Sequence, residues 1–306
     1  FSISLLDHSG IGSLPIAWFG NAEQKTRYLP LLATGAKIGS YALTEPGSGS
    51  DALSAKTKAV LSPDGTCYIL NGTKQFITNA GFADLYITYA KVNGENFTAF
   101  IIDKNTPGII LGPEEKKMGI KGTSTRSVIL ENARVPVENL LYEIGKGHKV
   151  AFDLLNIGRF KLGAGCVGLC KLALREAVRY AKQRIQFGQP IGSFGLIQKK
   201  LAEMAIRTYV AESIVYRTAG MIEQILSRIN QEDERAGLET AKGLKSTPLS
   251  VQSIRSMPPR PWTTWLTRPS RFLAVTATSQ TFRPSESIET RGSTDFLREP
   301  TKSTDC

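Results

Sequence analysis

The sequence predicts a multidomain α+β protein in which helical, β and helical segments follow one another along the chain. Residues 40–136 hold β-branched and aromatic residues in short runs between turn signals, whereas residues 147–243 carry apolar residues at spacings of three and four. Seven of the fifteen prolines fall within 248–300, among many Ser and Thr, and neither period continues there. We therefore expect residues 244–306 to form a disordered tail.

Residues 1–39 are expected to be helical. Asn21 and Gln24, three positions apart, form the capping-box pattern that starts a helix, and Gly35 suits its end. We expect Pro30 to kink or split this stretch, because proline lacks the N–H that a helix uses. The chain opens in a helical pattern without Met, so the natural N-terminus is expected to be missing.

The middle segment, 40–136, is expected to hold several short strands. "SPDG" at 62–65 and the pair Asn71 and Gly72 are strong hairpin-turn signals, and further strands are expected at "FTAFIID" and "TRSVILENARVPV". Short strands with turns between them favour an antiparallel barrel or sandwich.

The last periodic segment, 147–243, is expected to hold two long antiparallel helices of a bundle. The stretch "IQFGQPIGSF" is expected to be the loop that joins them.

Composition excludes several classes of function. A chain that is 41% hydrophobic and 21% charged is typical of a soluble globular protein, and neither a membrane-spanning run nor a signal peptide is visible. The net charge of +11 suits phosphorylated ligands, but no basic block with interleaved aromatics indicates nucleic acid. The four cysteines lack a pairing pattern, which favours a reducing compartment. His8 and His148 lack metal-ligand spacing, so we expect no metal site.

Two motifs could bind a ligand. In "YALTEPGSGSD" (41–51), glycines allow close approach of the backbone and hydroxyls could cradle a phosphate or a ring edge, although an ordinary Gly/Ser loop has the same composition. In "QFITN" (75–79), an aromatic ring and a hydroxyl could lie against a flat ligand, although the residues taken alone favour a strand with a core Phe.

Two further motifs lie in the second helical segment. "GAGCVG" (163–168) matches a dinucleotide fingerprint, but a helix rather than a strand precedes it, so close helix packing explains it better. "RIQFG" (184–188) places a cation at a helix end, where it could hold a pyrophosphate or simply favour the helix dipole.

Taken together and in order, "YALTEPGSGSD", "NGTKQFITNAG", "KKMGIKGTSTRSVILENARVP", "NIGRF" and "RIQFGQPIGSFGLIQKKLAEM" resemble the successive signatures of the acyl-CoA dehydrogenases. The resemblance runs from about residue 3 to 243, and "LLNIGRF" and "FGLIQ" are most similar to the very-long-chain branch. It implies that 1–39 is a remnant of an N-terminal helical domain, 40–136 the middle β domain, and 147–243 the first two helices of a C-terminal four-helix bundle.

The resemblance also implies an activity. Members of the family bind FAD and oxidise acyl-CoA thioesters to trans-2-enoyl-CoA, with a Glu removing the α proton while the β carbon gives a hydride to the flavin. Electrons would then pass to an electron-transferring flavoprotein. The alternatives are a non-catalytic remnant that binds FAD or acyl-CoA, and a related flavin oxidase. The expected compartment is the cytoplasm of a bacterium or the mitochondrial matrix of a eukaryote.

Site residues follow from the same resemblance. Ser50 should lie near the CoA arm, and Asn156 and Arg159 match the helix that contacts substrate. Gly195 stands where many relatives carry Gln, which puts one adenine-side contact in doubt. The expected flavin contacts are Tyr41, Leu43, Thr44, Gly49, Ser50, Phe76, Ile77 and Thr78, with Arg184, Gln186, Phe187 and Phe194 reaching the FAD of a neighbouring subunit in a homo-oligomer.

The catalytic base is missing from both places where the family carries it. One branch has Glu immediately before the Arg matched by Arg159, where this chain has Gly158; the others have it in an E-G-T stretch, absent from 244–306. A one-nucleotide shift of reading frame, however, allows "LREPTKSTDC" to read E-G-T-N-E-I-N-R-L. We therefore expect a frameshift near 243–246, and negligible dehydrogenase activity in the printed chain.

Overall fold

A computed structural model describes residues 2–230 and 232–245. The predicted disordered tail and the predicted frameshift both concern the C-terminal residues. From residue 246 onward, these residues lie outside the described ones. The described chain divides into two compact units. The first comprises the residues up to Gly158 together with Ser227–Lys245, and the second comprises Arg159–Leu226.

Four short helical elements open the first unit: α1 (Ser2–Asp7), η1 (His8–Gly12), α2 (Leu14–Phe19) and α3 (Ala22–Ala33). The predicted capping box is confirmed, since the Gln24 amide donates to Asn21 Oδ1 at 2.8 Å and the Asn21 amide to Gln24 Oε1 at 3.2 Å. Gly35, at φ +74°, follows the end of α3 as predicted.

Of the two outcomes predicted for Pro30, the split is wrong and the kink stays a prediction. α3 continues through Pro30, and close to the helix end the missing N–H removes only one intrahelical hydrogen bond. The helical segment is broken instead at glycines. Gly10 has non-helical dihedrals of φ −108° and ψ −107°, and Gly20 takes an extended conformation after α2.

An eight-stranded sheet follows, with the path β6-β7-β3-β2-β4-β5-β8 and with β1 paired to β4. The pairings of β4 with β1 and with β2 are parallel and the other pairings are antiparallel. The strands are β1 (Gly39–Ala42), β2 (Lys58–Leu61), β3 (Cys67–Thr78), β4 (Leu85–Val92), β5 (Asn96–Asp103), β6 (Ile109–Leu111), β7 (Thr125–Pro136) and β8 (Leu140–Leu141), with single turns η2 (Ala52–Ser54) and η3 (Val137–Asn139) between them.

Of the two predicted hairpin turns, one is confirmed and one is wrong. The turn at 62–65 joins β2 to β3, with the Gly65 amide bonded to the Ser62 carbonyl at 2.9 Å. Asn71 and Gly72, by contrast, lie inside β3, where the ladder to β7 shifts register. A Cβ on Gly72 would lie 2.4 Å from Thr57 Oγ1, so this glycine permits a close approach rather than a turn.

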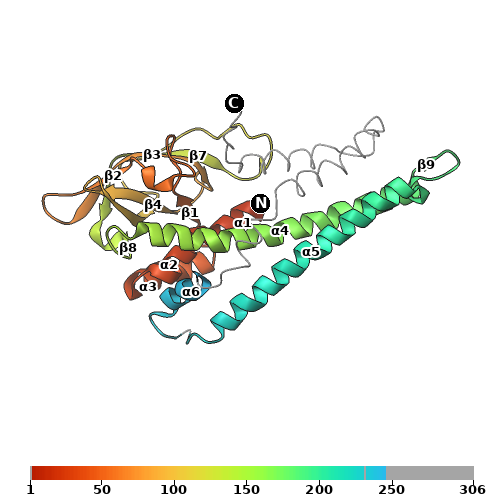
Figure 1. Cartoon of the computed structure of the whole chain (residues 1–306). Coiled ribbons are helices and arrows are strands. Elements are labelled where there is room, and N and C mark those ends of the chain that lie inside the picture. Colours follow the sequence, from red (N-terminus) through yellow and green to blue (C-terminus); the bar gives the residue numbers. More distant parts are fainter. Residues whose placement is uncertain (1, 231, 246–306) are drawn as a thin grey trace, which may run out of the picture. The chain divides into compact units, whose positions relative to one another are not determined.

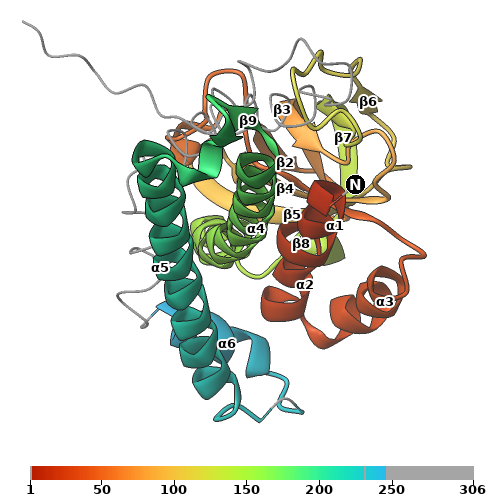
Figure 2. The same ribbon diagram turned by 90° about the vertical axis from the view of Figure 1, so that its right-hand side faces the viewer.

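The sheet is buried on both faces, as alternate residues of β4 show. Leu85, Ile87 and Tyr89 belong to one apolar cluster, which α2, α3 and the first turns of α4 (Gly147–Gln183) complete on one face of the sheet (Figures 1 and 2). Tyr86 and Ala90 belong to a second cluster, formed with residues of β3, β5 and β7. The short helix α6 (Ala236–Lys245), which the sequence analysis did not separate, packs against α2.

The second unit pairs the later part of α4 with α5 (Gly195–Leu226), and Figure 1 shows them side by side. Ala177 packs with Met204, and the Lys171 ammonium contacts the Glu212 carboxylate, so the two helices run antiparallel. The expected connection between them is a tight hairpin of β9 (Ile185–Gln186) and β10 (Gln189–Pro190), followed by η4 (Ile191–Ser193).

Candidate functional site

Two of the predicted motifs come together in the first unit. Ser40 Oγ donates to the Thr78 carbonyl at 2.5 Å, and the Gln75 amide donates to the Thr44 carbonyl at 2.8 Å. These two bonds join the end of β1 to the end of β3, so that 41–44 lies beside 75–78. The two motifs begin 34 positions apart in the sequence, at residues 41 and 75, and the sheet brings them into one place.

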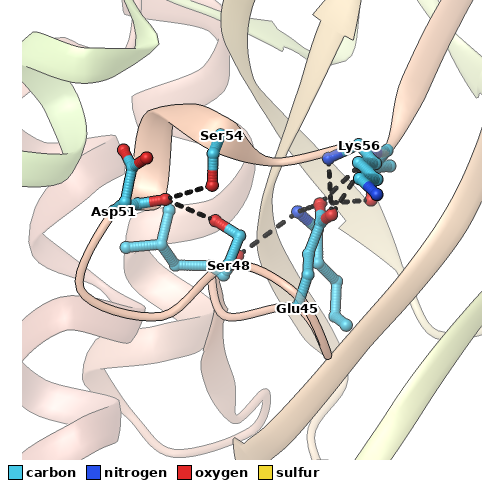
Figure 3. A network of polar contacts seen from close by, with 8 residues as sticks. Glu45, Ser48, Asp51, Ser54 and Lys56 are labelled. Carbon is cyan, nitrogen blue, oxygen red and sulfur yellow. Dashed lines mark hydrogen bonds and ion pairs between the residues drawn. The ribbon is translucent and has the colours of Figure 1, made fainter. Parts of the chain in front are cut away.

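The Gly/Ser motif continues as a tight loop held by its own polar groups (Figure 3). Glu45 and Ser48 exchange two backbone hydrogen bonds of 2.9 and 3.1 Å. The Asp51 carbonyl accepts from Ser48 Oγ at 2.7 Å and from Ser54 Oγ at 2.8 Å. Apart from its own atoms and those of its two neighbours in the chain, Gly49, at the exposed tip, has no heavy atom of the described chain within 4 Å of where a Cβ would stand. The loop is therefore ordered and its tip is open to a ligand.

A buried ion pair that the sequence analysis missed fixes the base of this loop. Lys74 Nζ lies 2.7 Å from Glu45 Oε1, and the two side chains are 0% and 5% exposed. Burial lowers the pKa of Lys74, with Glu45 opposing the shift. Burial alone would raise the pKa of Glu45, but Lys74 and the surrounding hydrogen bonds lower it. Lys74 is the single charged residue of β3, and this was the one available signal for the pair.

Phe76 has an unusual backbone at this junction. Its φ is +58°, in the left-handed region that non-glycine residues avoid, and the β3–β7 register shifts between Lys74 and Ile77. Its side chain is 38% exposed. Backbone strain of this kind costs about 1–3 kcal/mol and concentrates at binding sites. The result is a partly exposed aromatic residue that directly follows Gln75, whose amide is bonded to Thr44 of the Gly/Ser motif, and this placement suits a flat ring-shaped ligand.

Three of the expected contact residues have buried side chains. Tyr41 and Leu43 are each 8% exposed in the helix-covered cluster, and Ile77 is 2% exposed in the other cluster. Tyr41 also donates from its hydroxyl to the Ala151 carbonyl at 3.3 Å. Because their side chains are buried, these three residues could contact a ligand mainly through their backbone. Their side chains support the neighbouring residues instead. Thr44 and Thr78 are partly exposed, and Ser50 is exposed.

The substrate-helix residues lie in the middle of α4. Asn156 and Arg159 are partly buried and nearly one helical turn apart. Gly158 stands between them, and a Cβ there would meet only Ile11 Cγ2, at an ordinary contact distance of 3.6 Å. The backbone therefore does not require glycine at this position.

The remaining expected residues gather at one end of the second unit. Phe187 is 93% exposed, and its ring meets that of Phe194 edge to face at a centroid distance of 6.2 Å. Arg184 and Gln186 are exposed in the same hairpin. The expected flavin contacts thus fall into two groups, one in each unit, whereas Asn156 lies in the first unit and Arg159 in the second.

Two structural findings bear on other classes of site. Among the residues described, no cluster of three or more His, Cys, Asp or Glu is arranged to hold a metal ion. No helix in the described ranges has the length and apolar character needed to cross a membrane.

Comparisons with known proteins agree with the motif resemblance. Residues 40–133 match the family model of the acyl-CoA dehydrogenase middle domain, and residues 145–242 match that of the acyl-CoA dehydrogenase C-terminal domain. A probable acyl-CoA dehydrogenase of Bacillus subtilis is 57% identical over 244 residues, covering 80% of this chain and 41% of that protein.

Two further relatives extend the comparison. The human mitochondrial very long-chain specific acyl-CoA dehydrogenase is 45% identical over 231 residues, covering 72% of this chain and 35% of that protein. The crystal structure of acyl-CoA dehydrogenase complexed with FAD from Bacillus anthracis superposes with a TM-score of 0.89 at 50% identity, covering 94% of this chain and 50% of that chain.

The chain therefore spans half or less of the length of these three relatives. Three findings nevertheless lead to one assignment. Two adjoining family models match the chain, its relatives are similar in sequence, and it shares with them a mixed fold with a sheet in the middle and helices after it. The chain belongs to the acyl-CoA dehydrogenase family, a family of oxidoreductases.

Proposed function

We propose that the gene of this chain encodes an FAD-dependent enzyme that oxidises acyl-CoA thioesters to trans-2-enoyl-CoA. The observation that carries this proposal is the pairing of the Gly/Ser loop with the end of β3, where the Gln75 amide donates to the Thr44 carbonyl and the partly exposed Phe76 follows Gln75 in the chain. The relative from Bacillus anthracis, whose structure contains FAD, supports the choice of cofactor.

The Gly/Ser loop, Phe76 and α4 would hold the cofactor and substrate in distinct ways. FAD, when bound, supplies the acceptor for the hydride that leaves the β carbon. The Phe76 ring would lie against the flat ring system, and Thr44 and Gly49 would offer hydroxyl and amide donors at its edge. Ser50, at the exposed tip, would meet the CoA arm. Asn156 and Arg159, on α4, would contact the acyl-CoA.

The second unit would complete the site of another copy of the chain. Phe187 is almost fully exposed although it is a large apolar residue, and the neighbouring Arg184 and Gln186 provide polar groups suited to a pyrophosphate and an adenine. We therefore propose a homo-oligomer in which Arg184, Gln186, Phe187 and Phe194 reach the FAD of a neighbouring subunit. An electron-transferring flavoprotein is the proposed acceptor of the electrons.

The finer architecture is part of the same proposal. Residues 1–39 would belong to an N-terminal helical domain, 40–136 to a middle β barrel or sandwich, and 147–243 to the first two helices of a four-helix bundle. The second apolar cluster draws residues from strands along the whole path of the sheet, from β6 and β7 to β5 and β8. A cluster shared by strands so far apart in the sheet supports a barrel or sandwich. The exposed large side chains along α5, among them Leu196, Ile206 and Tyr209, support further helical partners for it.

The catalytic base sets a limit on activity. Residues 244–306 contain no E-G-T stretch and position 158 is Gly, so neither place expected for the base carries a Glu. We propose that the printed 306-residue chain has negligible dehydrogenase activity. The second candidate function, a non-catalytic protein that binds FAD or acyl-CoA, is favoured by this same observation.

One experiment tests the cofactor site and the activity of the chain together. The purified chain is titrated with FAD while flavin absorbance and fluorescence are recorded, and then mixed with acyl-CoA and an electron-accepting dye. Flavin binding without enoyl-CoA is the expected result. Enoyl-CoA formation would contradict the proposed inactivity, and a chain that folds but leaves the flavin signal unchanged would contradict the proposed cofactor site.

A further inference from the structure

The buried pair of Lys74 and Glu45 holds the Gly/Ser loop to β3 along three consecutive loop residues. Lys74 Nζ contacts the Leu43 carbonyl at 3.4 Å and Glu45 Oε1 at 2.7 Å. Between these two contacts, the Gln75 amide donates to the Thr44 carbonyl at 2.8 Å. Two adjacent strand residues therefore fix the loop immediately before Phe76.

Glu45 extends this connection to the far end of the loop. Its carboxylate accepts from the Lys56 amide at 2.6 Å and from Thr57 Oγ1 at 2.5 Å. The Thr57 amide lies 3.2 Å from Oε1 and 3.3 Å from Oε2 (Figure 3 shows the Lys56 side of this network). The Glu45 carboxylate, at the start of the loop, thus binds both the residues that follow the loop, Lys56 and Thr57, and Lys74 of the neighbouring strand β3. The nearby Gly72, without a Cβ, lets Thr57 approach β3.

Stability alone is a weak explanation for this arrangement. Burying two charges costs desolvation energy, and a well-packed apolar pair of similar volume is often as stable or more so. Buried polar networks whose members are all satisfied do, however, select one geometry. Here the geometry selected is that of the loop and of the strained Phe76, two residues beyond Lys74.

We propose that Lys74, acting through Glu45, is a positioning residue that fixes the loop 44–51 against β3 in the conformation that receives the flavin. The flavin part of this inference rests on the proposed function, whereas the positioning of the loop does not. Loop geometry and flavin affinity are therefore measured separately.

The test uses a double variant, Lys74→Met with Glu45→Gln, in the full chain. Met keeps most of the Lys volume, and Gln keeps an acceptor for Thr57 while both charges are removed. Hydrogen exchange is followed by mass spectrometry in a peptide covering 44–51 and in one covering β4. We expect at least tenfold faster exchange in the loop peptide with unchanged exchange in β4. Equal loop exchange in the variant and the parent would overturn the proposal.

A matched control and a milder variant complete the design. Lys37→Met removes a half-exposed ion pair with Asp103, elsewhere in the same unit, and should leave loop exchange unchanged. Thr57→Val removes only the hydroxyl that donates to Glu45 and should speed loop exchange severalfold. If the double variant loses β4 protection and so fails to fold, Thr57→Val decides the question, and unchanged loop exchange in it counts against the proposal.

FAD titration of the same proteins gives the second readout. We expect the FAD dissociation constant of the double variant to rise at least tenfold, with a flavin spectrum closer to that of free FAD, while Lys37→Met matches the parent. Parent-like flavin binding together with a loosened loop would overturn the flavin part of the inference. A folded parent that binds no FAD would instead contradict the proposed function, and loop exchange would still decide the role of Lys74.

Discussion

Gly237 lies so close to Trp18 that a Cβ added to the glycine would stand 2.5 Å from the Trp18 Cα and 2.5 Å from the Ala17 carbonyl oxygen. The contact joins α6 to α2, two helices separated by more than two hundred residues. Because the nearest atoms are backbone, they cannot move aside as a flexible side chain could. The absence of a side chain at 237 is therefore a condition for this packing.

The first prediction concerns this contact. Gly237→Ala should destabilise the chain by about 1–3 kcal/mol, the usual cost of overpacking a well-packed site. The matched control is Gly220→Ala, at a helical glycine of α5 with open space around the position of its Cβ, which should stabilise by up to about 1 kcal/mol. Urea unfolding followed by circular dichroism measures both, and a neutral or stabilising Gly237→Ala would contradict the packing of α6 on α2.

The second prediction concerns the pH dependence of stability. Asp7 is 7% exposed and accepts from Asn79 Nδ2 at 3.2 Å, and burial raises the pKa of its carboxyl well above the usual value. Between the ordinary Asp pKa near 3.9 and the raised one, the folded state binds more protons than the unfolded state. Stability should therefore fall as pH rises through this window, by at most about 1.4 kcal/mol per pH unit for one proton.

Asp7→Asn should remove this slope and raise the melting temperature at neutral pH. The new amide cannot ionise, and it can also donate toward Asn79 Oδ1, which is buried and has no hydrogen-bond partner among the described residues. Asp64→Asn is the control, because hydrogen bonds from Ser62 and Thr66 lower the pKa of that exposed carboxyl to about 2. The Asp64 carboxyl is ionised in both the folded and the unfolded protein between pH 5 and 8. The pH slope of stability of Asp64→Asn in this range should therefore match that of the parent. An unchanged slope in Asp7→Asn would contradict the assignment.

Local signals in the sequence were enough to predict the helix start at Asn21, the turn at 62–65 and the two paired helices. Each depends on residues a few positions apart, where capping, turn geometry and periodicity act directly. The prediction of a hairpin turn at Asn71 and Gly72 was wrong because an Asn-Gly pair is compatible both with a turn and with the close approach of two strands. Only the position of Thr57 decides between them, and Thr57 meets Gly72 through tertiary structure.

The features of the candidate site likewise divide into those that local sequence signals predicted and those that depend on tertiary structure. The motifs and their family resemblance named the segments expected at the site, but they did not predict that Lys74 and Glu45 pair inside the protein. Neither residue has a partner in its own motif, and long-range pairing depends on strand register. Likewise, the burial of Tyr41 and Ile77 depends on which face of each strand meets the core, and the residue types alone did not settle that.

The third prediction concerns the exposed hairpin of the second unit. Because Phe187 is 93% exposed, Phe187→Ala should change the unfolding free energy of the flavin-free chain by less than about 0.5 kcal/mol. If the hairpin reaches the FAD of a neighbouring subunit, the same change should weaken FAD binding at least tenfold. Leu196→Ala, at a 77% exposed residue of α5, is the control and should leave FAD binding unchanged. FAD titration and thermal unfolding measure the two effects, and equal FAD affinity in both variants would count against the role of Phe187.

The fourth prediction concerns the missing base. Position 158 precedes the partly buried Arg159, and a Cβ there would meet only Ile11 Cγ2 at 3.6 Å, so we expect Gly158→Glu to be tolerated and to favour the helix by up to about 1 kcal/mol. In the chain reconstituted with FAD, the new carboxylate would stand where one branch of the family carries its base. General base catalysis contributes about 10²–10⁴-fold, so enoyl-CoA formation should exceed that of the control Gly158→Gln by at least about 100-fold. The control has the same shape without basicity, which separates proton removal from a simple change in packing. Equal rates in the two folded, flavin-binding variants would show that a carboxylate at 158 does not reach the α proton.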